Sequence, residues 1–369
     1  MQDPSHIAAA VTGLAFALAF VLGAVAQRVS FCTMGAITDI VNFGDWRRMR
    51  MWLLAIAVAI GGTSLLHAFG AIDTAKTIYT APNVAWLSHL VGGFLFGIGM
   101  TLASGCGSKT LIRVGAGNLK SVIVLTFLAI AAYMTLKGAF APWRAFTLDP
   151  VRVDVGAPTS DFGTLAAAWG LGAAAKLWIP IIVAAAIALF VFANREFRST
   201  GELIVGGIIV GAVIVGGWYV SGHLGYIAED PASLEEKFAA TNSGRLESFS
   251  FVAPAAYLLE LLVLWTDQSR VLTFGIAAVL GVLAGSAAMA LATRTFRWEG
   301  FASAEDTANH IVGGVLMGFG GVTALGCTIG QGLTGLSTLA IGSVLTFFAI
   351  VAGCVAAVKY QTWRVEKMA

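Results

Sequence analysis

Long apolar runs separated by short polar stretches dominate the sequence. Seven of the runs approach the length of about 20 residues that an α-helix needs to cross a bilayer. They cover residues 7–26, 52–69, 119–136, 177–193, 203–220, 271–291 and 339–358. Shorter apolar pieces at residues 36–43, 165–175 and 250–265 are too short to span and predict interfacial or re-entrant segments.

One apolar, glycine-rich stretch occurs twice. Residues 89–106 and 310–327 align without a gap at a spacing of 221 positions, and ten of the eighteen positions are identical. A match of this length at fixed register indicates that half of the chain is duplicated. We therefore expect a first membrane repeat at 1–145, a connecting loop and linker helix at 146–200, and a second membrane repeat at 201–369.

The positions of the basic and acidic residues predict a membrane topology. Basic residues cluster at 45–50, at 195–198 and at Arg294 and Arg297, which predicts cytoplasmic ends, whereas the acidic segment 223–247 is expected outside. The polar, Arg-containing stretch 137–161 is expected to be the loop between the halves. An odd number of crossings in the first half would invert the second half relative to the first.

Composition confirms the class that the apolar runs suggest. Charged residues make up only 11% of the chain, the mean hydropathy is +0.84 and the net charge is +2. The sequence therefore predicts an all-α polytopic membrane protein with about nine transmembrane helices, re-entrant half-helices, two inverted pseudo-repeats and an hourglass-like shape. The charge balance gives no indication of nucleic-acid binding.

The four cysteines are the candidate functional residues. They form no C-x-x-C pair and no zinc-type spacing, so a disulfide framework or a metal site is not expected. Cys106 and Cys327 end the two repeated helices, where chain breaks are tolerated only if they are buried in protein or line a wet cavity. Cys32 follows a similar break with polar neighbours, whereas Cys354 is interpreted as a core residue. We expect no cofactor, because no binding motif for one is present.

The residues around these breaks favour a soft anion as ligand. Glycines 105, 107, 326 and 330 allow a tight backbone, and the N-terminus of a following half-helix attracts negative charge. A thiol is a small, polarizable, weak donor that suits a sulfur-bearing anion, whereas a hard oxyanion would favour arginine forks. The expected binding residues are Cys32, Cys106, Cys327, Gly105, Gly107, Gly326, Lys109 and Gln331. Lys109 and Arg113 would attract the anion, and Gln331 would donate a hydrogen bond.

Other repeated residues are interpreted as structural. His89 and His310 are expected to form hydrogen bonds at the starts of the repeated helices. Gly93, Gly97 and Gly318 are expected to allow close helix packing.

Three motifs also carry a family resemblance. Gln27-Arg28-x-x-Phe31-Cys32-x-x-Gly35, the stretch from Gly92-Gly93 to Ser104-Gly105-Cys106, and the stretch from Gly313-Gly314 to Gly326-Cys327 resemble the YeeE/YedE family of bacterial inner-membrane proteins. The likeness covers nearly the whole chain. It implies a multi-pass inner-membrane protein that takes up thiosulfate, handed along by S–H hydrogen bonds from Cys32, Cys106 and Cys327. It also implies a separate, small TusA-like sulfur-carrier protein at the cytoplasmic face.

Two alternatives remain open at this stage. A membrane thiol–disulfide oxidoreductase would need two cysteines that can bond to each other. A transporter of another sulfur or selenium compound would keep the same architecture. We favour the thiosulfate transporter, which is not an enzyme.

Overall fold

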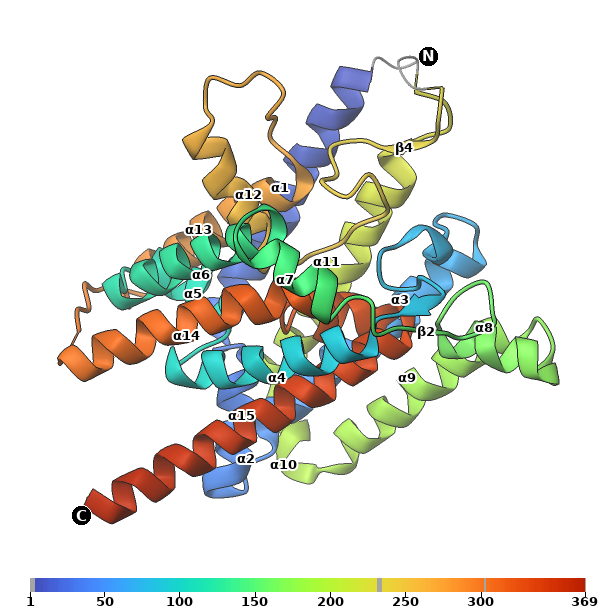
Figure 1. Cartoon of the computed structure of the whole chain (residues 1–369). Helices are drawn as coiled ribbons and strands as arrows, with labels where there is room; N and C mark the ends of the chain where they lie inside the picture. The colour runs from blue at the N-terminus through green and yellow to red at the C-terminus, as the bar shows by residue number, and fades with distance from the viewer. Residues whose placement is uncertain (1–3, 231–233, 302, 369) are drawn as a thin grey trace.

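The structure is a computed structural model, and it describes residues 4–230, 234–301 and 303–368. In these residues the chain is overwhelmingly helical, and apart from isolated bridges its β-structure consists of two short antiparallel pairs (Figure 1). The strand β1 (Asn83–Val84) pairs with β2 (Val153–Asp154), and β3 (Tyr226–Ile227) pairs with β4 (Lys237–Phe238). The architecture is therefore the all-α one that the apolar runs predict.

The first half of the chain supplies the helices that precede residue 138. They are α1 (Pro4–Arg28), α2 (Thr33–Phe43), α3 (Arg47–Ala68), the 3-10 helix η1 (Thr74–Lys76), α4 (Trp86–Leu102), α5 (Gly107–Gly115) and α6 (Leu119–Lys137). The short helices α2 and α5 each follow a long helix after a break. These are the half-helices that the interrupted apolar runs predict.

The connecting region and the second half follow. The connecting elements are α7 (Phe140–Thr147), α8 (Phe162–Ala166), the π-helix η2 (Ala167–Leu171), α9 (Ala175–Ala193) and α10 (Arg195–Arg198). The second half contains α11 (Gly201–Tyr219), the π-helix η3 (Val220–Leu224), α12 (Val252–Val263), α13 (Phe274–Ala292), α14 (Ala304–Thr323), the π-helix η4 (Gly330–Gly335), the 3-10 helix η5 (Leu336–Thr338) and α15 (Ile341–Met368).

The number of long apolar helices agrees with the sequence. Within the described residues, eight helical segments are long and apolar enough to cross a membrane. The 20-residue helix α14 is a further long helix, although it begins with the charged pair Glu305 and Asp306. Together these helices correspond to the roughly nine crossings that the sequence predicts, and the chain is a multi-pass membrane protein.

The helices of the two halves exchange partners in a symmetric way. Helix α1 packs on α13 while α11 packs on α3, and α4 packs on α15 while α14 packs on α6. Likewise, α12 contacts α6 and α2 contacts α15. Two pairs, α1 with α11 and α4 with α14, join matching helices of the two halves. Figure 1 shows α4, α14 and α15 side by side in the middle of the molecule.

Glycines allow this close packing, as the sequence predicts. A Cβ atom at Gly97 of α4 would collide with the carbonyl oxygen of Ile350 in α15. In the other half, a Cβ atom at Gly318 of α14 would collide with the carbonyl oxygen of Leu128 in α6. Small residues at such crossings let two helix backbones approach closely in a membrane protein.

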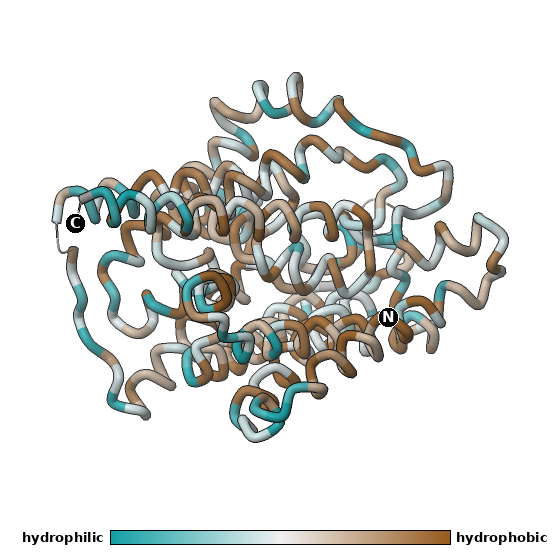
Figure 2. Tube along the Cα trace, turned by 90° about the horizontal axis from the view of Figure 1, so that it is seen from below, coloured by the Kyte–Doolittle hydropathy of each residue, from teal (hydrophilic) through white to brown (hydrophobic). Residues whose placement is uncertain are grey.

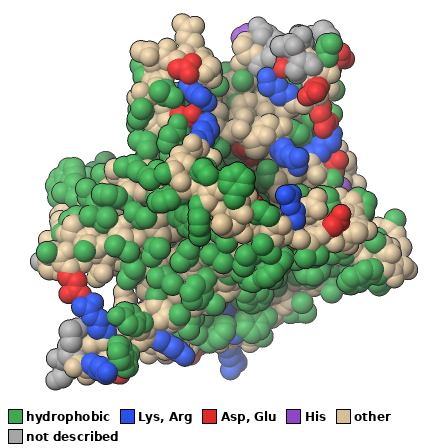
Figure 3. Space-filling model, viewed as in Figure 1, with side chains coloured by type: hydrophobic (Ala, Val, Ile, Leu, Met, Phe, Trp, Pro, Cys, Tyr) green, Lys and Arg blue, Asp and Glu red, His purple; other side chains and the backbone are tan. Residues whose placement is uncertain are grey.

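Apolar side chains cover the outside of the molecule. On α9, Ile182 and Leu189 are 61% and 75% exposed, and Phe348 of α15 is 65% exposed. Hydrophobic side chains extend across the middle of the space-filling view, and charged side chains gather toward its upper and lower ends (Figure 3). Along the chain trace the hydrophilic stretches lie mainly in loops and at the C-terminal end (Figure 2). An apolar surface of this extent indicates contact with lipid.

Several predicted boundaries need correction. The arginines at 47, 48 and 50 belong to the first turn of α3 and not to a turn between helices, because the chain reverses earlier, at Gly44 in the left-handed conformation. The segment 137–161 contains α7 and β2 and is not a plain loop. The interfacial helix expected at 165–175 lies earlier, in α8 and η2, because Gly170 and Gly172 adopt positive φ angles at its end.

Residues from the predicted basic stretches line two neighbouring cavities. A groove of about 1160 Å³ is lined both by residues of the 45–50 stretch and by residues around 194–203. It shares Ser30 and Arg48 with a second cavity that also contains Arg297. The fold thus brings Arg47, Arg48 and Arg297 close to the 194–203 segment, and the cytoplasmic location of this side stays a prediction.

Candidate functional site

Three long helices end in the same kind of turn, and a cysteine follows each turn. Ser30, Ser104 and Leu325 adopt the left-handed conformation, with φ angles of 50°, 56° and 59°. The next residue donates its N–H to a carbonyl five positions earlier, which is the pattern of a Schellman cap. These bonds join Phe31 to Ala26, Gly105 to Met100, and Gly326 to Gly321. Cys32, Cys106 and Cys327 therefore occupy equivalent positions.

The glycines around the turns act differently from the expectation. Residues with positive φ are Ser104 and Leu325, whereas Gly105, Gly107 and Gly326 do not belong to the positive-φ set. These glycines instead leave room for neighbouring side chains. A Cβ atom at Gly326 would lie 3.1 Å from the Gln331 side chain, and one at Gly105 would lie 3.3 Å from Cγ of Lys109.

Two of the three sulfurs accept a hydrogen bond from a backbone N–H three residues ahead. The N–H of Gly35 donates to Sγ of Cys32, and the N–H of Gly330 donates to Sγ of Cys327, both at 3.4 Å. Cys106, which precedes α5, makes no such cap bond. A sulfur that accepts a hydrogen bond is fixed in position, and its own S–H remains available to donate.

The fold brings the thiols of both halves into one buried region. The side chains of Cys32 and Cys106 interact with each other, and the Thr328 hydroxyl, next to Cys327, faces the Cys106 thiol. Ser108 Oγ lies 3.3 Å from Sγ of Cys106. Cys32, Cys106 and Cys327 are 6%, 1% and 0% exposed. We refer to this region, which contains these three cysteines and Thr328, as the waist.

One hydroxyl beside the thiols lacks a hydrogen-bond partner. Oγ1 of Thr33, the residue after Cys32, is buried and unpaired, whereas the buried hydroxyl of Thr328, the residue after Cys327, faces the Cys106 thiol. A buried polar group without a partner costs about 1–3 kcal/mol, so such groups generally mark a place where water or a ligand binds. The waist is therefore lined by more polar groups than its own contacts satisfy.

The second half does not reproduce the regular half-helix of the first. Cys106 precedes the α-helix α5, whereas a turn and the π-helix η4 follow Cys327. Three glycines among the six residues of η4 explain the difference, because glycine disfavours a regular helix. Gln331 uses its amide group to donate to the carbonyl of Ala324, and its Oε1 is buried without a partner.

A fourth break occupies the position that matches Cys32. Phe251 precedes α12 as Cys32 precedes α2, and the backbone of Phe251 interacts with the Cys327 thiol. The first residue of α12, Val252, is fully buried. Its side chain lies 3.7 Å from where a Cβ atom on Gly107 would be. The waist is therefore bounded by four chain breaks, three with cysteine and one with valine.

One cavity opens beside Cys32, and we name it the Cys32 cavity. It has a volume of about 330 Å³ and includes Gln27, Ser30, Cys32, Met34, Gly35, Arg48, Ser104, Lys109, Arg113, Arg297 and Glu299. Lys109 and Arg113, which the sequence singles out, are thus beside Cys32. Arg48 is also there, although the sequence pattern indicates only a topology signal for this residue.

A second cavity opens beside the other repeated turn, and we name it the Gly326 cavity. It measures about 170 Å³, and its lining includes Tyr79, Arg144, Glu247, Ser250, Pro254, Tyr257, Leu325 and Gly326. Four of its positions match lining positions of the Cys32 cavity at a spacing of 220 or 221 residues. The matched pairs are Gln27 with Glu247, Ser30 with Ser250, Met34 with Pro254, and Ser104 with Leu325.

Cys354 and the two histidines lie in helix contacts. The hydroxyl of Thr101 in α4 donates to Sγ of Cys354 in α15 at 3.3 Å. Nδ1 of His89 lies 2.7 Å from the hydroxyl of Thr346, and Nδ1 of His310 lies 2.7 Å from the carbonyl oxygen of Asp306. These contacts agree with the structural roles that the sequence predicts for all three residues.

Fold and site together define a class: a multi-pass membrane protein whose two halves bring three buried thiols together near two cavities. The chain matches the model of the sulphur transport family over residues 28–356 and belongs to that family. It is 28% identical over 319 residues to a protein of Escherichia coli strain K12 named thiosulfate transporter TsuA, covering 85% of this chain and 84% of the relative. A protein of Spirochaeta thermophila with the same name is 27% identical over 344 residues, with coverage of 90% and 94%.

Proposed function

We propose that this protein takes up thiosulfate into the cytoplasm through the waist. The relatives named as thiosulfate transporters support the cargo, and the arrangement of the thiols supports the path. One observation carries the mechanism: three thiols are gathered in one buried region, and the sulfurs of Cys32 and Cys327 are each held by a backbone N–H. Their S–H groups can donate in turn to the terminal sulfur of the anion.

The chemistry of the waist suits a desolvated anion. A dianion that leaves water needs hydrogen-bond donors, and charge-assisted hydrogen bonds are stronger than neutral ones. The thiols and the hydroxyls of Thr33 and Thr328 supply donors without a fixed charge. The anion is thus solvated but not trapped by a full salt bridge. Exit therefore stays fast, as conduction through a narrow site requires.

The orientation follows from the basic clusters. We place the Cys32 cavity on the cytoplasmic side and the Gly326 cavity outside, with the two repeats inverted relative to each other. In this orientation the protein is a multi-pass protein of the bacterial inner membrane, and the anion passes Cys327, Cys106 and Cys32 in that order. The role is transport rather than enzymatic catalysis.

Uptake of radiolabelled thiosulfate by cells that lack their own thiosulfate uptake system tests the proposal. We expect Cys106→Ala and Cys327→Ala to lower the initial rate by at least about tenfold, because a donor to a charged group is lost. Cys354→Ala is the matched control, since this thiol is equally buried but contacts Thr101. Undiminished uptake in both waist variants would overturn the mechanism.

A sulfur carrier at the cytoplasmic face completes the proposal. The groove of about 1160 Å³, which shares Ser30 and Arg48 with the Cys32 cavity, is lined by charged side chains of both signs, including Arg28, Glu196 and Glu202. It suits a small TusA-like protein that accepts the imported sulfur compound. We expect deletion of such a carrier to reduce thiosulfate-dependent growth. Unchanged growth, with no association in pull-down experiments, would remove the carrier from the proposal.

The contact between Cys32 and Cys106 supports a second candidate function. Two adjacent thiols can form a disulfide, as a membrane thiol–disulfide oxidoreductase requires. Mass spectrometry after rapid alkylation separates the two functions. A transporter shows both thiols alkylated during uptake at full rate, whereas an oxidoreductase shows a reversible bridge between Cys32 and Cys106.

A further inference from the structure

The Cys32 cavity concentrates positive charge at one side of the waist. Arg48, Lys109, Arg113 and Arg297 line it, and Glu299 is the acidic residue in the same lining. The Glu299 carboxylate accepts a hydrogen bond from Nδ2 of Asn118 at 2.7 Å and lies 3.9 Å from the Lys120 ammonium group. The cations of the cavity therefore outnumber its acids.

Two cationic side chains of α5 are held beside the turn that precedes Cys106. Lys109 and Arg113 are four residues apart on one helix face, where like charges repel. Nη1 of Arg113 donates to the carbonyl oxygen of Ser104 at 2.8 Å, which bends the side chain back toward the turn that presents Cys106. The Lys109 side chain is partly buried, lines the cavity with Cys32, and packs against Gly105, the residue before Cys106. Two repelling cations held in this position favour an anion between them.

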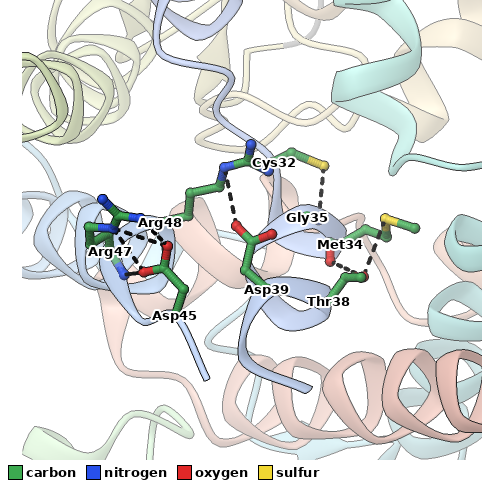
Figure 4. A network of polar contacts seen from close by, with 8 residues as sticks. All are labelled: Cys32, Met34, Gly35, Thr38, Asp39, Asp45, Arg47 and Arg48. Carbon is green, nitrogen blue, oxygen red and sulfur yellow. Dashed lines mark hydrogen bonds and ion pairs between the residues drawn. The ribbon is translucent and has the colours of Figure 1, made fainter. Parts of the chain in front are cut away.

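Arg48 reaches the Cys32 thiol from another helix. It belongs to the first turn of α3, the end of a helix that disfavours positive charge. Its guanidinium passes over Gly35: a Cβ atom there would lie 2.8 Å from Nη1 of Arg48 and 3.8 Å from Sγ of Cys32. Figure 4 shows Arg48 extending from α3 toward Asp39 and the Cys32 end of α2. Glycine at position 35 thus leaves the guanidinium beside the thiol.

Asp39 is the resting partner of Arg48. Nε of Arg48 lies 3.3 Å from Oδ2 of Asp39, and both side chains are partly exposed. A partly exposed pair of this kind contributes little stability. An incoming anion can therefore replace the carboxylate of Asp39 at the guanidinium.

We propose that Arg48, Lys109 and Arg113 form an anion-binding site that receives the cargo after the waist, and that Asp39 occupies Arg48 while the site is empty. The ligand class is a small dianion with one soft sulfur and an oxygen-bearing end. Its sulfur faces the Cys32 thiol, and its oxygens face the guanidinium groups, which bind oxyanions through paired N–H donors. Competition from Asp39 keeps the affinity moderate, so that the anion is released. The direction of passage rests on the proposed function, whereas the site itself does not.

Purified full-length protein in detergent tests the site without any transport. The rate at which Cys32 reacts with an anionic methanethiosulfonate reagent is compared with the rate for a cationic one, and the Cys32 peptide is quantified by mass spectrometry. We expect the ratio of the anionic to the cationic rate to fall about fivefold in Arg48→Gln and in Lys109→Gln, because a nearby charge is removed.

Arg47→Gln is the matched control. Arg47 lies in the same helical turn, but its guanidinium pairs with Asp45 at 2.7 Å and it does not line the Cys32 cavity. We expect this variant to keep the wild-type ratio, because Arg47 is farther from the thiol. Equal ratios in Arg48→Gln and Arg47→Gln would overturn the proposal.

Protection of Cys32 by thiosulfate gives the affinity. We expect the half-protective concentration to rise about tenfold in Arg48→Gln and to fall about threefold in Asp39→Asn, where the competing charge is lost. Protection that is insensitive to both changes would reject the site, even if cells take up thiosulfate. Arg48-dependent protection without cellular uptake would retain the site and reject the proposed function instead.

Discussion

The Cys32 cavity and the Gly326 cavity occupy matching places in the two halves but differ in chemistry. Both lie beside a Schellman-type turn, and four lining positions correspond at a spacing of 220 or 221 residues. However, the cations Lys109 and Arg113 of the first half correspond to Gly330 and Thr334 in the second. The two cavities thus lie at matching turns of the repeat, whereas Lys109 and Arg113 have no cationic counterpart in the second half.

Because of this difference, an anion on the proposed path meets different chemistry at the two cavities. The Gly326 cavity is lined mainly by uncharged side chains, with Arg144 and Glu247 as its charged residues. Nε of Arg144 lies 3.2 Å from Oδ2 of Asp149, so this cation already has a neighbour of opposite charge. On the proposed path, an anion would pass from a nearly neutral cavity, through a waist of neutral donors, to a cationic cavity. The asymmetry decides where along the path the anion binds, whereas the electrochemical gradient decides the direction of net uptake.

The helix scaffold is expected to respond equally in both halves, and this is the largest effect. Gly97→Leu and Gly318→Leu each place a side chain against the backbone of a packed helix. We expect each to destabilise the protein by ~3 kcal/mol, because overpacked contacts force the helices apart. Thermal unfolding in detergent measures the change.

Gly13→Leu is the control for the scaffold prediction. A Cβ atom at Gly13 of α1 would meet nothing within 4 Å. We expect this variant to unfold at the wild-type temperature. A large effect at Gly97 together with none at Gly318 would contradict the structural equivalence of the two halves.

The next largest effect is expected when Cys32, before α2, is given the side chain of Val252, its counterpart at the start of α12. Cys32→Val places at the start of α2 the residue type that Val252 supplies at the start of α12. We expect thiosulfate uptake to fall about 30-fold, because a donor to a desolvated anion is worth roughly 2 kcal/mol. Cys32→Ser, which retains a donor, should recover part of the rate in the same uptake assay. Equal rates for the valine and serine variants would argue against hydrogen-bond donation by Cys32.

Removing the charge asymmetry has a smaller effect. The double variant Lys109→Gly and Arg113→Thr gives the first half the residues of the second. We expect uptake to fall about tenfold and its dependence on ionic strength to weaken, because two partly screened charges are lost. The reciprocal change, Gly330→Lys, is not a clean test, because the added Cβ atom would clash with the Ser250 side chain at 2.5 Å. Initial rates at low and high salt distinguish charge from packing.

The sequence predicts the scaffold better than the contacts at the site. The repeated glycines and cysteines identify the helix ends, since a duplicated Gly-Cys corner has a simple pattern at fixed spacing. The left-handed residues are not visible in this way, because Ser104 and Leu325 carry side chains that rarely adopt positive φ. Arg48 is also missed, because only the reversal between α2 and α3 brings it to Cys32. The π-helix η4 has no sequence signal beyond its glycines.

The smallest predicted effect concerns the one carboxylate of the Gly326 cavity. Glu247 lies in the loop before α12, where Gln27 is its uncharged counterpart in the other cavity. Burial raises the pKa of Glu247, although the Ser243 N–H donates to its carboxylate at 2.8 Å and opposes the shift. The charged form therefore appears only as the pH rises through this raised pKa. Because the carboxylate repels an entering dianion, we expect wild-type uptake to increase as the pH falls, by about threefold.

Glu247→Gln removes this dependence by giving both cavities the same side chain. Between about pH 5 and pH 8 the variant should transport at the rate that the wild type reaches at low pH. Arg144, the other charged residue of the cavity lining, keeps its charge over this range, so it adds no titration of its own. A variant whose uptake still rises on acidification would place the titrating group elsewhere. In that case the charge difference between the two cavities would reside in the cations of the Cys32 cavity alone.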